Sequence, residues 1–260
     1  MILEEFDKCK TSTFDPYEVQ SVVPNFPKIG VSCFSNKLLE KLNDAFKGEV
    51  IAKISNGNGY KPVYKISYNG VDIALFNSIV GAPACVVALE EVFAMGLEEL
   101  IIFGTCGVLD SCLSDLSIII PTSAVRDEGT SYHYAESSEE IEINPKYKED
   151  FIDLLNEHNY SYTIGKTWTT DAPYRETREK VIKRKEQGCI CVEMEFSAIS
   201  ALAKFRNKEV FQFLYSADNL DAAKWDKRSL GNEDMLDEKS KIGLLAIKLA
   251  EKITKQKNRR

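Results

Sequence analysis

The stretch Leu100-Ile-Ile-Phe-Gly-Thr-Cys-Gly107 is an apolar run that leads directly into a segment bounded by two glycines. A short apolar run of this kind predicts a buried strand. Residues 104–107 are then expected to form a tight turn, in which glycine accepts positive φ. The segment could equally bring backbone N–H groups close to an anion or a sugar. The residues leave both interpretations open, and both place this segment at the end of a strand.

Strand-like and helix-like runs alternate along the chain on both sides of this segment. We expect strands at residues 71–76, 117–120 (ended by Pro121), 162–168, 189–192 and 210–215, and helices at 84–95, 147–156, 175–187, from about 196 through 204, and 238–255. Strands separated by helices imply a parallel or mixed sheet with helices on its faces. No linker-like stretch splits the chain, so we expect one α/β domain over residues 1–260.

The composition is that of a globular protein. The 260 residues are 44% hydrophobic and 28% charged, which excludes collagenous, low-complexity and wholly disordered chains. The net charge of −7 argues against a nucleic-acid partner. The acidic start is no signal peptide, and no apolar run is long enough for a membrane helix, so we expect a cytoplasmic protein without a membrane partner. The basic end, residues 252–260, is interpreted as a solvated helix end rather than a nucleic-acid tail.

The cysteines and histidines do not predict a metal site. Seven cysteines are scattered through the chain, mostly inside apolar runs, so we expect buried free thiols rather than a disulfide framework. There is no C-x-x-C pair, and the two histidines, His133 and His158, lie far apart. We therefore expect neither a metal nor an organic cofactor.

Polar residues follow three of the expected strands, where ligand sites in such sheets lie. These segments are residues 104–107, 193–195 and 216–219. Glu193 and Glu195 could bind the two hydroxyls of a vicinal diol or stabilise a helix N-terminus. Asp218 could cap a turn or act as a general acid. A G-x-x-x-x-G-K-[ST] phosphate loop and a G-x-S-x-G nucleophile turn are both absent.

Taken together, these segments make the chain resemble the nucleoside phosphorylase-I family. The resemblance runs from about Gly30 to the final helix, and five segments carry it: Gly81-Ala-Pro-Ala84, Gly104-Thr-Cys-Gly107, Arg126-Asp-Glu-Gly-Thr-Ser-Tyr-His-Tyr134, Val192-Glu-Met-Glu195 and Ser216-Ala-Asp-Asn219. It implies a single domain with a mixed, partly barrel-like central sheet flanked by helices. It also implies a homodimer or a hexamer of dimers, because subunits of the family contribute residues to a neighbour's site.

The reaction implied by the resemblance is cleavage of the N-glycosidic bond of a ribonucleoside by phosphate, giving the base and ribose 1-phosphate. Glu195 is similar to the family glutamate that accepts hydrogen bonds from the ribose 2′- and 3′-hydroxyls. Met194 resembles the apolar floor under the sugar, although a plain core methionine fits the same position. Glu193 is similar to a more peripheral carboxylate of the ribose site.

The resemblance makes Asp218 the group that protonates N7 of a leaving purine, so we expect purine nucleosides rather than uridine. Residues 126–134, by contrast, look more like the uridine phosphorylase version of their segment. The residues that the resemblance implies as contacts of the base are Pro173, Tyr174, Arg178 and Val192. Arg228 or Arg178 is a candidate cationic helper for the leaving base.

The phosphate site implied by the resemblance consists of Gly30, Thr105, Cys106 and Gly107, with phosphate as co-substrate. The family's arginines are missing: residues 30–35 contain none, Ile102 occupies the place of a second, and the stretch matching the neighbour's arginine offers Lys61 alone. Phosphate usually needs such charged donors. Two alternatives therefore stay open, a nucleosidase that uses water and a nucleoside-binding protein without turnover.

Overall fold

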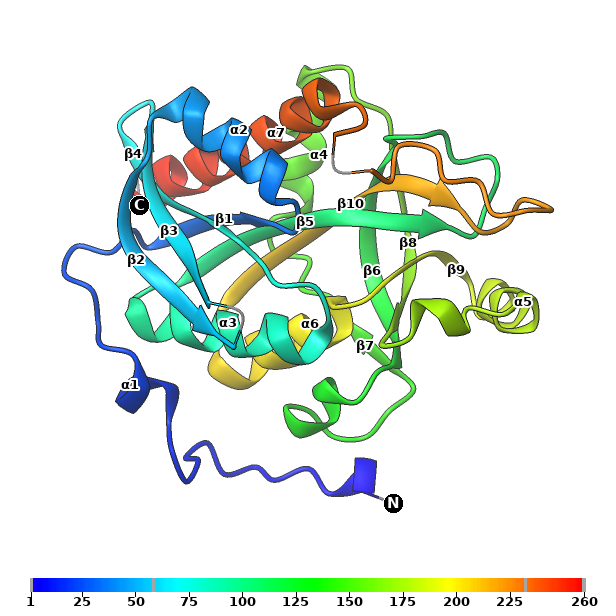
Figure 1. Cartoon of the computed structure of the whole chain (residues 1–260), viewed down its shortest axis with the longest axis horizontal. Helices are drawn as coiled ribbons and strands as arrows, with labels where there is room; N and C mark the ends of the chain where they lie inside the picture. Colours follow the sequence, from blue (N-terminus) through cyan, green and yellow to red (C-terminus); the bar gives the residue numbers. More distant parts are fainter. Residues whose placement is uncertain (1, 58, 232, 259–260) are drawn as a thin grey trace.

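Five strands of the central sheet close into a mixed barrel (Figure 1). In the computed structural model, which describes residues 2–57, 59–231 and 233–258, the ring runs through β10 (Glu209–Asn219), β6 (Ile118–Asp127), β8 (Tyr162–Thr170), β9 (Cys189–Glu193) and β5 (Glu99–Val108). The pairing of β5 with β10 closes it. The expected α/β domain with a mixed, partly barrel-like sheet is confirmed.

The sheet continues beyond β5 as an open wing. Its order from β5 outward is β1 (Ile29–Cys33), β4 (Val71–Asn77), β3 (Gly59–Tyr68) and β2 (Glu49–Asn56). β1 is parallel to β5 and β4, whereas β3 is antiparallel to both of its neighbours. The short β7 (Glu140–Glu142) pairs with β6.

Helices cover both faces of the sheet. α3 (Ala82–Met95) and α6 (Phe196–Arg206) pack on one face, and α2 (Asn36–Phe46), α4 (Lys148–Glu157) and α7 (Leu236–Lys257) pack on the other. Each layer encloses its own apolar cluster, so hydrophobic burial holds the sheet from both sides. Shorter helical segments are α1 (Pro16–Val19), α5 (Arg178–Glu186) and the 3-10 turns Ile2–Glu4, Thr130–His133 and Pro173–Arg175.

The turn expected at residues 104–107 is wrong, because β5 continues to Val108. Neither glycine of this segment has positive φ. Both are needed for space instead: a Cβ on Gly104 would lie 2.7 Å from Cδ2 of Phe34, and a Cβ on Gly107 would lie 2.2 Å from Cδ1 of Leu220. The glycines therefore let two neighbouring segments approach the strand closely.

Two other strands run further than expected. β6 does not end at Pro121 but continues to Asp127, with a shift of register against β8 between Pro121 and Ser123. An irregularity of this kind tolerates a residue without an N–H donor. β10 extends to Asn219, so Asp218 is a strand residue and does not cap a turn.

All seven cysteines are free thiols, and five of them are buried, as expected. At the basic end, Lys252 pairs with Asp150 and Lys257 with Glu99, and both Lys255 and Lys257 are exposed. Arg259 and Arg260 lie outside the described residues. Within the described ranges, no helix has the length and apolar character needed to cross a bilayer.

Candidate functional site

The pairing of three barrel strands brings the three predicted strand-end segments together. Gly107 of β5 is the register partner of Asp218 on β10 and of Val192 on β9. The register along β10 shifts between Ser216 and Asp218, which leaves Ala217 as an extra residue. The two glutamates that follow Val192 therefore lie across Gly107 from Asp218.

Three adjoining cavities open at this point. The central cavity has a volume of about 280 Å³ and is lined by Phe34, Val80, Thr105, Cys106, Gly107, Pro173, Glu176, Val192, Glu193, Met194, Glu195, Asp218, Leu220 and Leu230. The inner cavity, about 130 Å³, shares Phe34, Val80, Thr105 and Leu230 with it. The outer cavity, about 580 Å³, shares Pro173, Glu176, Asp218, Leu220 and Leu230 and adds Tyr174, Arg178, Val181 and Trp225.

Glu195 is the buried carboxylate of the central cavity. It precedes α6 and is 5% exposed. The N–H of Gly81 donates to its Oε1 at 2.6 Å. Burial, together with the charge of Glu193, raises the pKa of Glu195 to about 8. One carboxylate oxygen is thus fixed by the protein, and the group reaches into the space where a ligand would lie.

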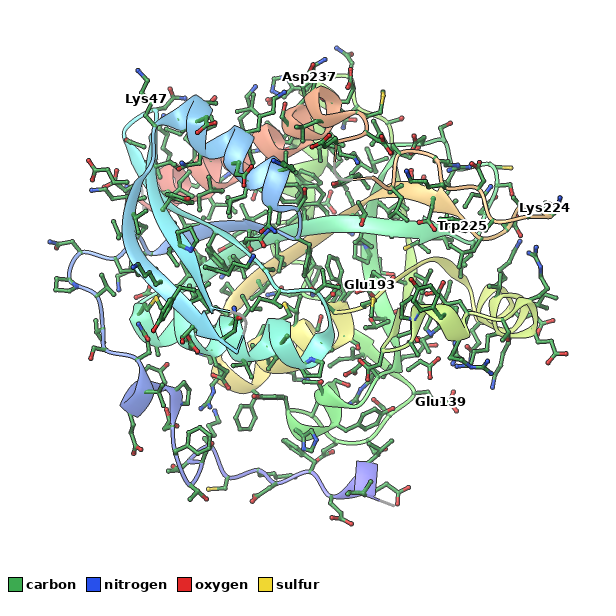
Figure 2. The ribbon with its side chains drawn as sticks, viewed as in Figure 1. Lys47, Glu139, Glu193, Lys224, Trp225 and Asp237 are labelled. Atoms are coloured by element: carbon green, nitrogen blue, oxygen red, sulfur yellow. The ribbon has the colours of Figure 1, made fainter. Side chains whose placement is uncertain are left out.

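Glu193 supports the start of α6 rather than facing a ligand freely. Its Oε1 accepts from the hydroxyls of Thr169 at 2.5 Å and Thr167 at 3.3 Å. Its Oε2 accepts from the N–H groups of Glu195 at 2.7 Å and Phe196 at 2.6 Å. Burial raises the pKa of Glu193 to about 7, although these four donors oppose the shift. Figure 2 shows this side chain inside the molecule.

The raised pKa of Glu195 predicts a pH dependence of turnover. The role that the resemblance implies for Glu195, accepting hydrogen bonds from two ribose hydroxyls, needs the carboxylate, so on this assignment kcat/KM should rise with pH through a midpoint near pH 8. The matched variant Glu193→Gln removes a neighbouring negative charge and should move this midpoint to lower pH. A pH–rate profile of both proteins checks the assignment. A wild-type profile without a rising limb would contradict it.

Asp218 is 8% exposed and has one oxygen committed to the protein. The indole N–H of Trp225 donates to its Oδ2 at 2.8 Å. Burial raises the pKa of Asp218, while the Trp225 hydrogen bond and the charge of Arg228 oppose the shift. A carboxyl whose pKa is raised in this way is suited to hold and deliver a proton.

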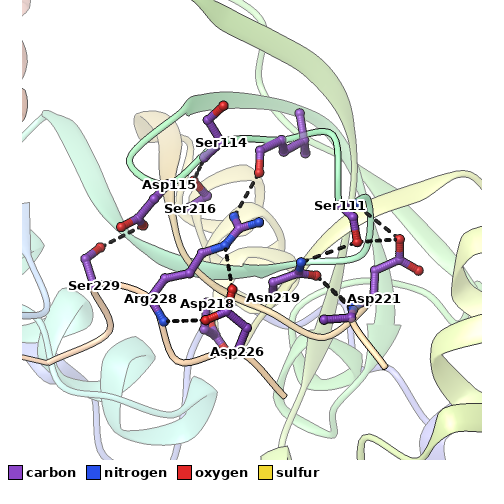
Figure 3. Close-up of polar contacts among 12 residues, drawn as sticks. Ser111, Ser114, Asp115, Ser216, Asp218, Asn219, Asp221, Asp226, Arg228 and Ser229 are labelled. Atoms are coloured by element: carbon purple, nitrogen blue, oxygen red, sulfur yellow. Dashed lines mark hydrogen bonds and ion pairs between the residues drawn. The ribbon is translucent and has the colours of Figure 1, made fainter. Parts of the chain in front are cut away.

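Arg228 does not face the central cavity. Its guanidinium donates to the carbonyl of Leu113 at 2.8 Å and lies 3.5 Å from Oδ2 of Asp226 (Figure 3). Ser229 donates to Asp115 at 2.8 Å in the same network. These contacts fasten the loop that follows β10 to residues 110–116, and Trp225 lies on that loop (Figure 2).

Arg178 holds the first part of the same loop. It begins α5 and donates to the carbonyls of Leu220 at 3.0 Å and Ala222 at 2.5 Å. It also lines the outer cavity, as do Pro173 and the fully exposed Tyr174. The residues implied at the base thus lie together with Asp218: Pro173, Tyr174 and Arg178 share the outer cavity with it, and Val192 shares the central cavity.

The residues that the resemblance implies as phosphate ligands lie in two separate places in the structure. Thr105, Cys106 and Gly107 line the central cavity, and burial raises the pKa of the Cys106 thiol. Gly30 lies in β1 opposite Leu100, five residues before Thr105 on β5. That spacing corresponds to about 16 Å along a strand. The structure does not bring Gly30 to the cavities.

Several lining residues were not predicted. Phe34, Glu176, Trp225 and Leu230 carry no motif. Burial, with the charge of Asp218, raises the pKa of Glu176 to about 7. Trp225 had one usable signal, since a lone tryptophan in a polar stretch of sequence is unusual. In the structure its side chain is 60% exposed. Glu176 offers no such signal in the sequence.

Comparison with known proteins identifies relatives of this chain. A family model described as the phosphorylase superfamily matches residues 28–254. A guanosine phosphorylase of Halorubrum lacusprofundi is 26% identical over 190 residues, which cover 72% of this chain and 77% of that protein.

Two solved structures share the fold. A uridine phosphorylase from Vibrio fischeri superposes with a TM-score of 0.74 at 20% identity, covering 94% of this chain and 99% of the other. A purine nucleoside phosphorylase from Toxoplasma gondii, in complex with immucillin-H, gives 0.71 at 17%, covering 89% and 98%.

Proposed function

The chain belongs to the phosphorylase superfamily, and we propose that it cleaves a purine ribonucleoside with phosphate to give the free base and ribose 1-phosphate. One observation carries the proposal: Glu195 and Met194 line the same cavity as Asp218 and Thr105. A sugar held by Glu195 over Met194 then has its base on the side of Asp218.

The proposed reaction assigns each residue one task. An oxygen of phosphate forms a bond to C1′ of the ribose while the bond from C1′ to the base nitrogen breaks. The electron pair of that bond goes to the purine, which takes a proton at N7 from Asp218. Glu195 holds both ribose hydroxyls and thereby fixes C1′ between the base and the nucleophile. Neither a metal nor an organic cofactor takes part.

Purine specificity rests on the two carboxyl groups with raised pKa values at the outer cavity. Asp218 and Glu176 both line it, and both can carry a proton toward a ring nitrogen. A pyrimidine has no nitrogen at the position of N7. The outer cavity, about 580 Å³, also has room for a two-ring base beside Trp225.

Base release from inosine, guanosine, adenosine and uridine, each with and without phosphate, tests the proposed function. We expect release from a purine nucleoside that depends on phosphate and forms ribose 1-phosphate in equal amount. Equal release without phosphate would show a nucleosidase. No release from any substrate, combined with saturable binding, would show a nucleoside-binding protein.

We further propose a homodimer or a hexamer built from dimers, located in the cytoplasm. Val80, two residues before α3, is 60% exposed and lines the central cavity, and Val87 within α3 is 58% exposed. A neighbouring subunit covering them would help to enclose the site, and mass measurement in solution tests this assembly.

The proposed location in the cytoplasm rests on the cysteines. Seven free thiols support a reducing compartment.

A further inference from the structure

The inner cavity contains a buried lysine side chain that belongs to none of the sequence motifs. Lys239 of α7 is 3% exposed and lines this cavity together with Thr105, Ser35 and Tyr215. Among the described residues that line the inner cavity, Lys239 is the only charged residue, and no aspartate or glutamate is present. A buried lysine normally lies next to an anion or pairs with one.

The hydrogen bonds that Lys239 makes to the described residues account for two of its three N–H donors. Its Nζ donates to the carbonyls of Ser229 at 2.5 Å and Gly231 at 2.8 Å. An ammonium group has three N–H donors, so two neutral oxygens satisfy neither its charge nor all its donors. Burial lowers the pKa of Lys239, while the charges of Asp234 and Asp115, which lie outside the lining of the cavity, oppose this shift.

Neutral donors surround the same space. Ser35 caps α2, so the inner cavity adjoins the N-terminus of an eleven-residue helix, where backbone N–H groups favour an anion. Thr105 lines both the inner and the central cavity and offers a hydroxyl at their junction. Burial raises the pKa of Tyr215, which keeps its phenol neutral and able to donate.

We propose that the inner cavity binds the phosphate co-substrate and that Lys239 supplies the positive charge for it. The inference rests on the proposed function and replaces the missing arginines with a lysine from the C-terminal helix. No arginine lines the central or the inner cavity within residues 2–57, 59–231 and 233–258. A phosphate bound there would meet the ribose of the central cavity across Thr105.

Lys61, which the resemblance implies for a neighbouring subunit's site, donates to the side chain of Asn36 at 3.1 Å and does not line the inner cavity of its own chain. Within one chain, the charge of the inner cavity therefore comes from Lys239.

Steady-state kinetics of Lys239→Gln with inorganic phosphate as the varied substrate tests the proposal. We expect the KM for phosphate to rise about ten- to hundredfold, the effect of losing one charge-assisted hydrogen bond. The KM for the nucleoside should change little. Lys239→Arg should recover part of the loss. The matched control is Lys241→Gln, which removes an exposed charge from the same helix and should leave both constants unchanged.

A second variant protects the test against misfolding. Lys239 also holds the loop at Ser229 and Gly231, so thermal unfolding of Lys239→Gln must be measured first. Thr105→Val leaves that loop intact and should raise the KM for phosphate as well, by about tenfold. An unchanged KM for phosphate in folded Lys239→Gln would overturn the proposal.

Calorimetric titration with phosphate separates this proposal from the proposed function. Wild type should bind phosphate, and Lys239→Gln should bind it at least about tenfold more weakly. If wild type releases base without phosphate and yet binds phosphate through Lys239, the proposed function fails and the anion site stands. If wild-type turnover needs phosphate and titration shows equal binding by both proteins, the function stands and the role of Lys239 is refuted.

Discussion

Glu195→Ala is expected to lower kcat/KM for nucleoside cleavage by about a hundred- to a thousandfold, the scale seen when a preorganised polar contact in the site is lost. The variant removes the acceptor for both ribose hydroxyls and with it the orientation of C1′. Steady-state assays with the best purine substrate measure the loss.

Two companion variants make the result for Glu195 interpretable. Alanine leaves the N–H of Gly81 without its 2.6 Å acceptor, which costs about 1–3 kcal/mol of folding free energy. Glu195→Gln keeps an oxygen for that N–H, removes the negative charge and should still lose most activity. Glu186→Ala, an exposed glutamate at the end of α5, should be neutral. Near-normal activity of folded Glu195→Ala would refute the ribose assignment.

Asp218→Asn is expected to reduce purine nucleoside cleavage by about a hundredfold or more, the usual contribution of a general acid. Asparagine still offers an oxygen to the indole of Trp225 but has no proton to deliver to N7. Uridine cleavage, where it occurs, should fall far less, because uracil has no such nitrogen. Parallel assays with inosine and uridine measure the ratio.

The control for Asp218 is Asp72→Asn, which neutralises an exposed carboxylate of β4. It should change neither activity. An equal loss of purine and uridine cleavage in Asp218→Asn would show that the residue supports the site rather than protonating the base. Unchanged purine cleavage would remove it from the mechanism.

The layered fold was predictable because its apolar runs are long and regular. The β5 run Leu100-Ile-Ile-Phe103 and the all-round apolar α3 can hardly occupy any other environment. The strands β1, β2, β3 and β7 and the helix α2 were missed. Most residues of β2 and β3 are exposed or half-buried, and Pro62 within β3 argues against a strand. β3 is placed by its pairing with β4, and β2 by its pairing with β3, and not by their own patterns.

The candidate site was predictable to the extent that motifs mark strand ends. Glu193, Glu195 and Asp218 follow apolar runs, and the barrel closure brings them to one cavity. Lys239 was not predictable, because a lysine in an amphipathic helix usually faces solvent. It is buried because α7 packs against the sheet where the loop after β10 crosses the helix. Gly30 is the opposite case: it belongs to a sequence motif, but its position in β1, opposite Leu100, keeps it away from the cavities.

The contact between Trp225 and Asp218 gives the protein a built-in optical signal. The chain has two tryptophans: Trp168 is fully buried, whereas Trp225 is 60% exposed and donates its indole N–H to Asp218, which lines the central and outer cavities. A purine that engages Asp218 changes the polarity around this indole, while the emission of Trp168 provides a constant background. Occupancy of the site can thus be followed by intrinsic fluorescence, without label or coupled enzyme, even for ligands that are never turned over.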